Sequence, residues 1–210
     1  MTRVKICGIT NLNDARHAVA GGADELGFNF FSGSKRYVSP AAAQEIIRMV
    51  SMPFTKVGVF VNETLENILA ISDDVGLDVI QLHGDEDVHF TAELGKQTER
   101  LVIKAFRVTS EFDIAIAADW PSDFALFDSH SPNQYGGTGV SFDLEEFGFQ
   151  IVATLSGIAY IAGGLTPANV AEVVRIIAPY AVDVASGVEI EPGKKDPAKV
   201  EAFIKNAKNA

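Results

Sequence analysis

Hydrophobic residues recur along this chain with two alternating spacings. Short apolar, β-prone runs alternate with segments in which apolar residues recur every three or four positions, the period of an amphipathic helix. We expect eight strands, at residues 4–7, 26–30, 56–61, 79–82, 101–106, 124–127, 159–162 and 182–185. The pattern therefore predicts repeated strand–helix units, as in parallel α/β proteins.

Amphipathic helices are expected between these strands. Five begin near Leu12, after Ser39-Pro40, after Asn62, after Asp85 and, near the end of the chain, at Asp196-Pro197. A sixth is expected to open at Thr166-Pro167, because a capping residue followed by proline is typical of a helix start. The apolar patterns at 114–118 and 142–149 are shorter and predict weaker helices after the fifth and sixth strands.

The number of units indicates the fold class. Eight strand–helix units in 210 residues leave about 26 residues for each, near the lower size limit of an eight-stranded α/β barrel. A doubly wound open sheet fits the alternation nearly as well. No linker or change in composition divides the chain, so we predict a single (β/α)8 barrel domain over residues 1–210.

Charge and composition limit the partners. The formal net charge of −11 disfavours a nucleic-acid-binding surface, but it leaves an anionic small substrate possible because net charge mainly affects solubility. One cysteine excludes an internal disulfide framework and a cysteine-rich metal site. His17, His89 and His130 share no common face, so no metal is expected. The absence of a signal-like or membrane-length apolar run predicts a cytoplasmic protein with no membrane partner.

The single cysteine, Cys7, ends the first apolar run, in the segment Val4-Lys5-Ile6-Cys7-Gly8-Ile9-Thr10. In parallel α/β proteins the carboxyl ends of the strands carry the chemistry, so the thiol there is a candidate base or nucleophile. The alternative is a small buried hydrophobic residue. Lys5 has the same strand parity, roughly 6.6 Å away along the strand, and a cation there favours the thiolate.

Small residues follow each of the last three strands. Glycine lets the backbone approach a ligand closely, and successive N–H groups near a helix start form a cradle for an anion. One such junction alone would be an ordinary turn, whereas three at these places favour a phosphate ester. The predicted phosphate-binding residues are Gly136, Gly137, Thr138, Gly139, Gly163, Gly164, Ser186 and Gly187.

Four further polar residues are candidates for the site. Asp128 closes the sixth strand without a helical pattern after it, and partial burial there favours the protonated, acid-competent carboxyl. Arg36 is either a solvated surface charge or a fork for a substrate carboxylate. His83, which shares strand parity with Gln81, is either a structural histidine or a substrate contact. Asp183 is either an inward polar group that holds the loops or a ligand contact.

These segments together resemble the phosphoribosylanthranilate isomerase family of tryptophan biosynthesis. The Lys-Ile-Cys-Gly-Ile-Thr segment is fairly specific to that family, whereas the glycine loops recur in many phosphate-binding barrels. The resemblance extends over residues 4–10, 33–39, 81–84, 126–128, 136–139, 162–165, 183–189 and 192–196.

The resemblance implies an Amadori rearrangement of a phosphorylated aminosugar, without cofactor or metal, by a monomer or homodimer. It implies that Asp128 is the acid that opens the furanose ring and Cys7 the base that removes the C2′ proton. Arg36 would hold the anthranilate carboxylate, with His83 and Asp183 as further substrate contacts, and the glycine loops would hold the phosphate.

Three residues depart from the family's usual pattern, and two other functions remain open. Val140 stands in place of a common lysine, Leu144 in place of tryptophan and Ala185 in place of serine. One rival function is that of another phosphosugar barrel enzyme, such as a histidine-pathway isomerase, a pentose-phosphate epimerase or indole-glycerol-phosphate synthase. The other is a non-catalytic phosphate-binding protein, because fold alone does not determine function.

Overall fold

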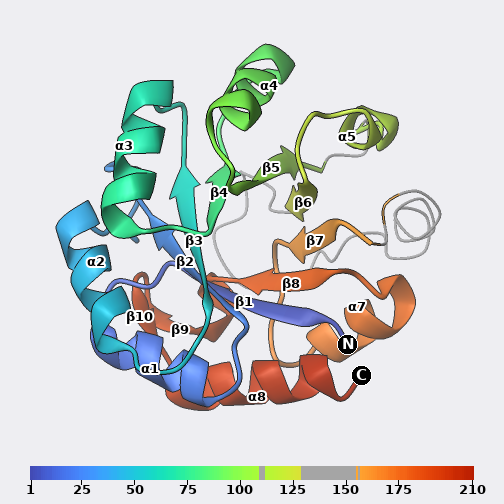
Figure 1. The fold of residues 1–210 in the computed structure, drawn as a ribbon. Helices are drawn as coiled ribbons and strands as arrows, with labels where there is room; N and C mark the ends of the chain where they lie inside the picture. The colour runs from blue at the N-terminus through green and yellow to red at the C-terminus, as the bar shows by residue number, and fades with distance from the viewer. Residues whose placement is uncertain (109–111, 129–154, 156) are drawn as a thin grey trace.

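A computed structural model describes residues 1–108, 112–128, 155 and 157–210. Eight parallel strands follow one another around a closed barrel, and helices surround it (Figure 1). The last strand pairs with the first, with Asp183 opposite Lys5 in the register. This pairing confirms the predicted (β/α)8 barrel and excludes the open sheet.

All eight predicted strands are present within a few residues of their expected ends. They are β1 (Arg3–Cys7), β2 (Glu25–Asn29), β3 (Thr55–Phe60), β4 (Val79–Leu82), β5 (Leu101–Arg107), β6 (Phe124–Asp128), β7 (Ala159–Ala162) and β8 (Ala181–Val184). The helices are α1 (Leu12–Ala20), α2 (Pro40–Met49), α3 (Leu65–Val75), α4 (Val88–Gln97), α5 (Ala115–Ala118), α7 (Val170–Ile177) and α8 (Pro197–Lys208). The helical pattern predicted at 142–149 lies outside the described residues.

Of the three predicted helix starts in which a capping residue precedes proline, those at Ser39-Pro40 and Asp196-Pro197 are correct and that at Thr166-Pro167 is wrong. Helix α8 begins at Pro197, and the Asp196 side chain accepts hydrogen bonds from the backbone of its first turn. Helix α7 begins at Val170, not at Thr166-Pro167. The Asn169 Oδ1 atom accepts the Thr166 backbone N–H at 2.7 Å, which folds these residues into a turn ahead of the helix.

A short hairpin that the apolar pattern does not predict lies between β8 and α8. After the 3-10 turn η1 (Ser186–Val188), strands β9 (Glu189–Glu191) and β10 (Lys194–Lys195) pair antiparallel. Strands of two or three residues are too short to show a period in the sequence. The hairpin matters because it carries Glu189 and Lys195, which are both buried.

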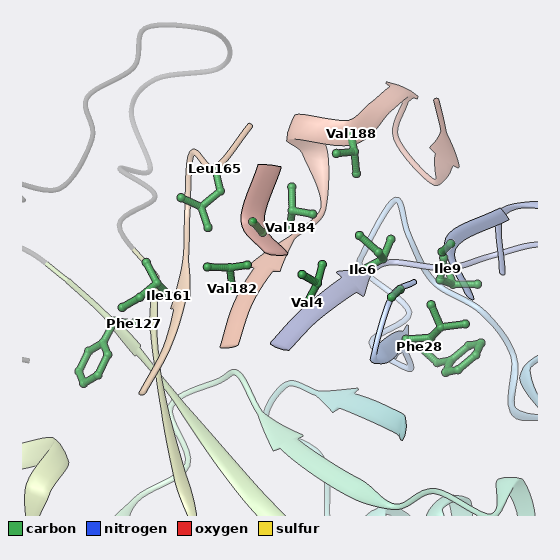
Figure 2. Packing of buried hydrophobic residues seen from close by; sticks show 14 of the residues in the cluster. Val4, Ile6, Ile9, Phe28, Phe127, Ile161, Leu165, Val182, Val184 and Val188 are labelled. Atoms are coloured by element: carbon green, nitrogen blue, oxygen red, sulfur yellow. The ribbon is translucent and has the colours of Figure 1, made fainter. Parts of the chain in front are cut away.

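Two apolar layers hold the barrel together, because successive side chains of a strand point to opposite faces. The outer layer lies between strands and helices, and Figure 2 shows Val4, Ile6 and Val182 side by side within it. The inner layer fills the barrel and consists of Val57, Val79, Ile103, Ala105, Leu126, Tyr160, Ala162 and Ala181. The barrel interior is therefore a packed core, and ligand contacts belong at its ends.

A polar cluster closes the amino end of the barrel. The Tyr160 hydroxyl donates to the Glu25 carboxylate at 3.0 Å, and the Arg3 Nε donates to the same carboxylate at 2.8 Å. Arg3 also donates from Nη2 to the Thr55 hydroxyl at 3.0 Å. Because these groups satisfy one another, this end of the barrel is built for stability.

Trp120, the only tryptophan, packs beside β5. Its ring meets that of Phe106 edge-on, with 5.3 Å between centroids, and its Nε1–H donates to the Thr91 hydroxyl of α4 at 3.1 Å. The indole thereby joins α4 and β5. Among the described residues, no helix is both long and apolar enough to cross a membrane.

Candidate active site

Cys7 lies at the carboxyl end of β1, where its sulfur occupies space left by a glycine on the neighbouring strand. Gly27 is the register partner of Cys7, and a Cβ atom at Gly27 would lie only 2.8 Å from the sulfur. Burial raises the pKa of the Cys7 thiol, Lys5 and Lys195 oppose that rise, and Asp183 adds to it. The net direction is upward, so the expectation that Lys5 favours the thiolate has the right sign but is outweighed by burial.

Lys5, two residues before Cys7 on β1, forms a buried ion pair with Asp183 on β8. The Lys5 Nζ lies 3.0 Å from Asp183 Oδ1, and the lysine is fully buried. Burial alone would lower the pKa of Lys5, but Asp183 and Cys7 outweigh it and raise the pKa. Lys5 therefore stays charged inside the barrel, held by Asp183.

Asp128 and His83 are brought together from two strands. Asp128 is the last residue of β6, and His83 directly follows β4. The His83 Nε2 lies 3.3 Å from Asp128 Oδ2, with both side chains about one quarter exposed. Gln81, fully buried on β4, places its Nε2 2.7 Å from His83 Nδ1. An imidazole and a carboxyl at this distance can share and exchange a proton.

Arg36 is held by a residue that the sequence analysis did not select. Its Nε and Nη2 donate to the two carboxylate oxygens of Glu189 at 2.8 and 2.7 Å, a bidentate ion pair that raises the pKa of Arg36. Lys195 Nζ lies 2.9 Å from the same carboxylate. Burial alone would raise the pKa of Glu189, but these two cations outweigh it and lower the pKa. Two cations and one carboxylate leave the cluster with a net charge of +1.

Arg36 also lies beside the carboxyl end of β1. A Cβ atom at Gly8 would lie 2.6 Å from Arg36 Cδ, so the arginine stem crosses the backbone directly after Cys7. The sequence offered a weak signal for its partners, since Glu189 and Lys195 stand in the segments 183–189 and 192–196 that carry the family resemblance. Their ion pairs join parts of the chain too far apart for any local pattern to reveal.

The described residues of the predicted phosphate loops come close together at the ends of β7 and β8. Gly163 and Gly164 have φ angles of +81° and +65°, which favour glycine. A Cβ atom at Gly187 would lie 1.9 Å from the Leu165 carbonyl oxygen, so the loops after β7 and β8 touch at this glycine. The other predicted phosphate contacts, Gly136, Gly137, Thr138 and Gly139, lie outside the described residues.

The described side chains can also be searched for a metal-binding site. No group of three or more His, Cys, Asp and Glu side chains in the described part of the chain is arranged to hold a metal ion. The ionisable residues Cys7, Asp128 and His83 instead gather at the carboxyl ends of the strands. Barrel enzymes carry their catalytic groups at this edge, and the fold and the site together place the chain among the (β/α)8-barrel enzymes.

Comparison with known proteins identifies the family. The sequence model of the N-(5'phosphoribosyl)anthranilate (PRA) isomerase family matches residues 4–206. The N-(5'-phosphoribosyl)anthranilate isomerase of Citrifermentans bemidjiense is 48% identical over 99% of this chain and 98% of its own length. That of Neisseria meningitidis is 49% identical over 98% and 96%. The chain belongs to the phosphoribosylanthranilate isomerase family.

Solved structures agree with this assignment. The phosphoribosyl anthranilate isomerase of Thermotoga maritima superposes with a TM-score of 0.89 at 42% identity, and all of both chains is covered. A second structure, at 40% identity and a TM-score of 0.85 with both chains fully covered, is a phosphoribosyl anthranilate isomerase in complex with reduced 1-(o-carboxyphenylamino)-1-deoxyribulose 5-phosphate. The described residues of this chain therefore have the fold of its family.

Proposed function

We propose that this chain, an isomerase of tryptophan biosynthesis by its family, uses Asp128 and Cys7 as acid and base. The reaction is the Amadori rearrangement of N-(5-phosphoribosyl)anthranilate to 1-(2-carboxyphenylamino)-1-deoxyribulose 5-phosphate. The observation that carries the proposal is the position of a carboxyl and a thiol at the carboxyl ends of β6 and β1. The analogue complex of the related isomerase supports the same substrate class.

Asp128 acts first, by giving its proton to the furanose ring oxygen. The bond between that oxygen and C1′ breaks, the ring opens, and the nitrogen lone pair forms an iminium ion with C1′. Asp128 is about one quarter exposed, which suits a carboxyl that must meet substrate yet hold a proton. Each such proton transfer contributes about 10²–10⁴-fold to the rate.

Cys7 then removes the C2′ proton as a thiolate. The electron pair of that C–H bond forms the C1′–C2′ double bond of an enolamine, which tautomerises to the ketone. Lys5 and Lys195 favour the charged sulfur, and burial opposes it. The two lysines therefore offset part of the cost of a thiolate in this partly buried setting.

The two ends of the substrate are anchored separately. Since the described hydrogen bonds of Arg36 occupy Nε and Nη2, we assign Nη1 to the anthranilate carboxylate. The net positive charge of the Arg36–Glu189–Lys195 cluster favours that anion. His83 and Asp183 complete the substrate contacts in this proposal. The loops at Gly163–Gly164, Ser186–Gly187 and 136–139 hold the phosphate.

The surroundings of the reaction belong to the same proposal. The chain works as one domain over residues 1–210 in the cytoplasm, its partner is the phosphorylated aminosugar, and no cofactor takes part. It acts as a monomer or homodimer; a related isomerase from Thermotoga maritima is described as dimeric. Size-exclusion chromatography with light scattering distinguishes the two.

Two substitutions test the catalytic assignment. With substrate made in situ and followed by the loss of anthranilate-type fluorescence, Cys7→Ala and Asp128→Asn should each lower kcat by at least about 10²-fold. Both variants should still bind the reduced product analogue, because neither change touches the phosphate loops. Near-normal turnover in Cys7→Ala would return the thiol to a packing role. Activity in Asp128→Asn would assign ring opening to another group.

A further inference from the structure

Gln81 is a buried polar residue that the reaction described above does not use. It lies on β4 with its side chain fully buried, and its Nε2 lies 2.7 Å from His83 Nδ1. Within the part of the chain that the structure describes, its Oε1 is buried without a hydrogen-bond partner. A buried amide oxygen without a partner is unfavourable, and an apolar side chain would avoid that cost. The amide is therefore explained by what its N–H group does.

The amide N–H determines which nitrogen of His83 carries the proton. An amide nitrogen can only donate, so Nδ1 of His83 must accept and cannot carry a hydrogen. The single N–H of the neutral ring is then on Nε2. This is the atom that lies 3.3 Å from Asp128 Oδ2. Through the His83 ring, Gln81 on β4 thus directs an N–H group at Asp128, which lies on β6.

We propose that Gln81 is a positioning residue for the isomerisation: it holds His83 as the Nε2–H tautomer, so that this N–H stabilises the carboxylate formed when Asp128 gives up its proton. The inference rests on the proposed role of Asp128 as the acid. Negative charge grows on Asp128 as the ring opens, and a hydrogen bond to an ionised acceptor is stronger than one to a neutral acceptor. The interaction therefore strengthens in the transition state and raises kcat.

The decisive measurement is the tautomer of His83, read from the ring ¹⁵N shifts in long-range ¹H–¹⁵N spectra and assigned with His83→Gln. In the wild type we expect Nε2–H. Gln81→Met keeps the length of the side chain but has no donor, and should give mixed tautomers. Gln81→Glu offers an acceptor and should move the hydrogen to Nδ1. If wild-type His83 carries its hydrogen on Nδ1, the inference is overturned, even where neither variant folds.

Kinetics provide the second readout. Gln81→Met should lower kcat about tenfold, the scale of one hydrogen bond, with KM changed less than about twofold. Gln81→Glu should lower kcat at least as far. Unchanged kcat in Gln81→Met, or a rise in KM alone, would overturn the inference and assign Gln81 to packing or to substrate binding.

Two further variants separate this inference from the proposed function. Ser72→Ala is the matched control, because Ser72 Oγ on α3 is likewise buried without a partner among the described residues. It should change neither kcat nor the His83 tautomer. Asp128→Asn should keep the Nε2–H tautomer, which Gln81 sets. An active Asp128→Asn with that tautomer would contradict the acid assignment alone, whereas an inactive one with the other tautomer would contradict the inference alone.

Discussion

At the scale of single residues, the site depends on charges that burial makes costly. In the proposed mechanism Cys7 loses a proton in a place where burial raises its pKa, and two lysines reduce that cost. The ordinary pKa of a cysteine thiol is 9.0, and the pKa of Cys7 lies above this value. The free enzyme therefore keeps Cys7 largely as the thiol at neutral pH.

This electrostatic balance predicts a pH dependence. Because the pKa of Cys7 is raised above 9.0, the fraction of Cys7 present as thiolate should still be rising with pH through the neutral range and past 9. The rate of alkylation by iodoacetamide, which follows the thiolate, should rise over the same range.

Lys195→Met tests whether the neighbouring lysines lower the pKa of Cys7. Lys195 is one of the two cations that lower the pKa of Cys7, so the alkylation curve of this variant should move to higher pH. A curve that stays in place, or an alkylation rate already constant at pH 7, would contradict the balance described here.

The sequence identified single residues where a local rule applied. Cys7 and Asp128 could be selected because each ends an apolar strand, and strand ends define the active edge of a parallel barrel. The partners Glu189 and Lys195 carry no such local mark, and Gln81 shows only that it shares strand parity with His83. The contacts of Glu189 with Arg36, and of His83 with Asp128, join parts of the chain that only the closed barrel brings close together.

At the scale of elements, the loops after β7 and β8 fit together at a position where only glycine leaves room. A Cβ atom at Gly187 would lie 1.9 Å from a backbone oxygen, which cannot rotate away as a side chain does. The 3-10 turn η1 and the loop before α7 can touch only while residue 187 has no side chain.

Gly187→Ala should therefore separate the two loops that we propose to hold the phosphate. We expect KM to rise about tenfold or more and the free energy of unfolding to fall by about 1–3 kcal/mol, the cost of overpacking. Steady-state kinetics and urea unfolding measure the two effects. Gly95→Ala on α4 is the matched control, because a Cβ atom there meets nothing within 4 Å. Equal behaviour of the two variants would contradict this account.

The bounds of strands and helices show where the hydrophobic periodicity of the sequence no longer predicts the structure. The strands could be predicted because each is a short run of mainly apolar, β-prone residues, and α8 because Asp196 caps it. The start of α7 could not, because Asn169 uses its side chain on the Thr166 backbone and closes a turn first. A cap–proline pair favours a helix start, but a nearby asparagine offers the backbone a competing hydrogen bond.

At the scale of the whole molecule, the barrel is closed between its first and last strands. The periodicity of the chain was compatible with an open sheet as well, since closure adds no new local pattern. The pairing of β1 with β8 distinguishes the closed barrel from an open sheet. The buried Lys5–Asp183 ion pair lies at this seam between the first and last strands.

Breaking that pair on one side should weaken the closure. Asp183→Leu leaves a buried lysine without its counter-charge, which costs about 3–5 kcal/mol in the free energy of unfolding. The double variant Lys5→Met/Asp183→Leu removes both charges and should recover most of that loss. Urea unfolding monitors both. A double variant no more stable than Asp183→Leu would show that the pair does more than neutralise its own charges.

The chain carries one tryptophan and one cysteine, and they stand on different parts of the barrel. Trp120 packs on β5 and α4, whereas Cys7 ends β1 beside the seam. Indole fluorescence and thiol labelling therefore report on separate halves without any engineered probe. Coincident denaturation curves from the two would mean that the barrel unfolds as a single cooperative unit. Curves that diverge would reveal a partly unfolded intermediate. The probe whose transition comes first, Trp120 or Cys7, would identify the part of the barrel that unfolds first.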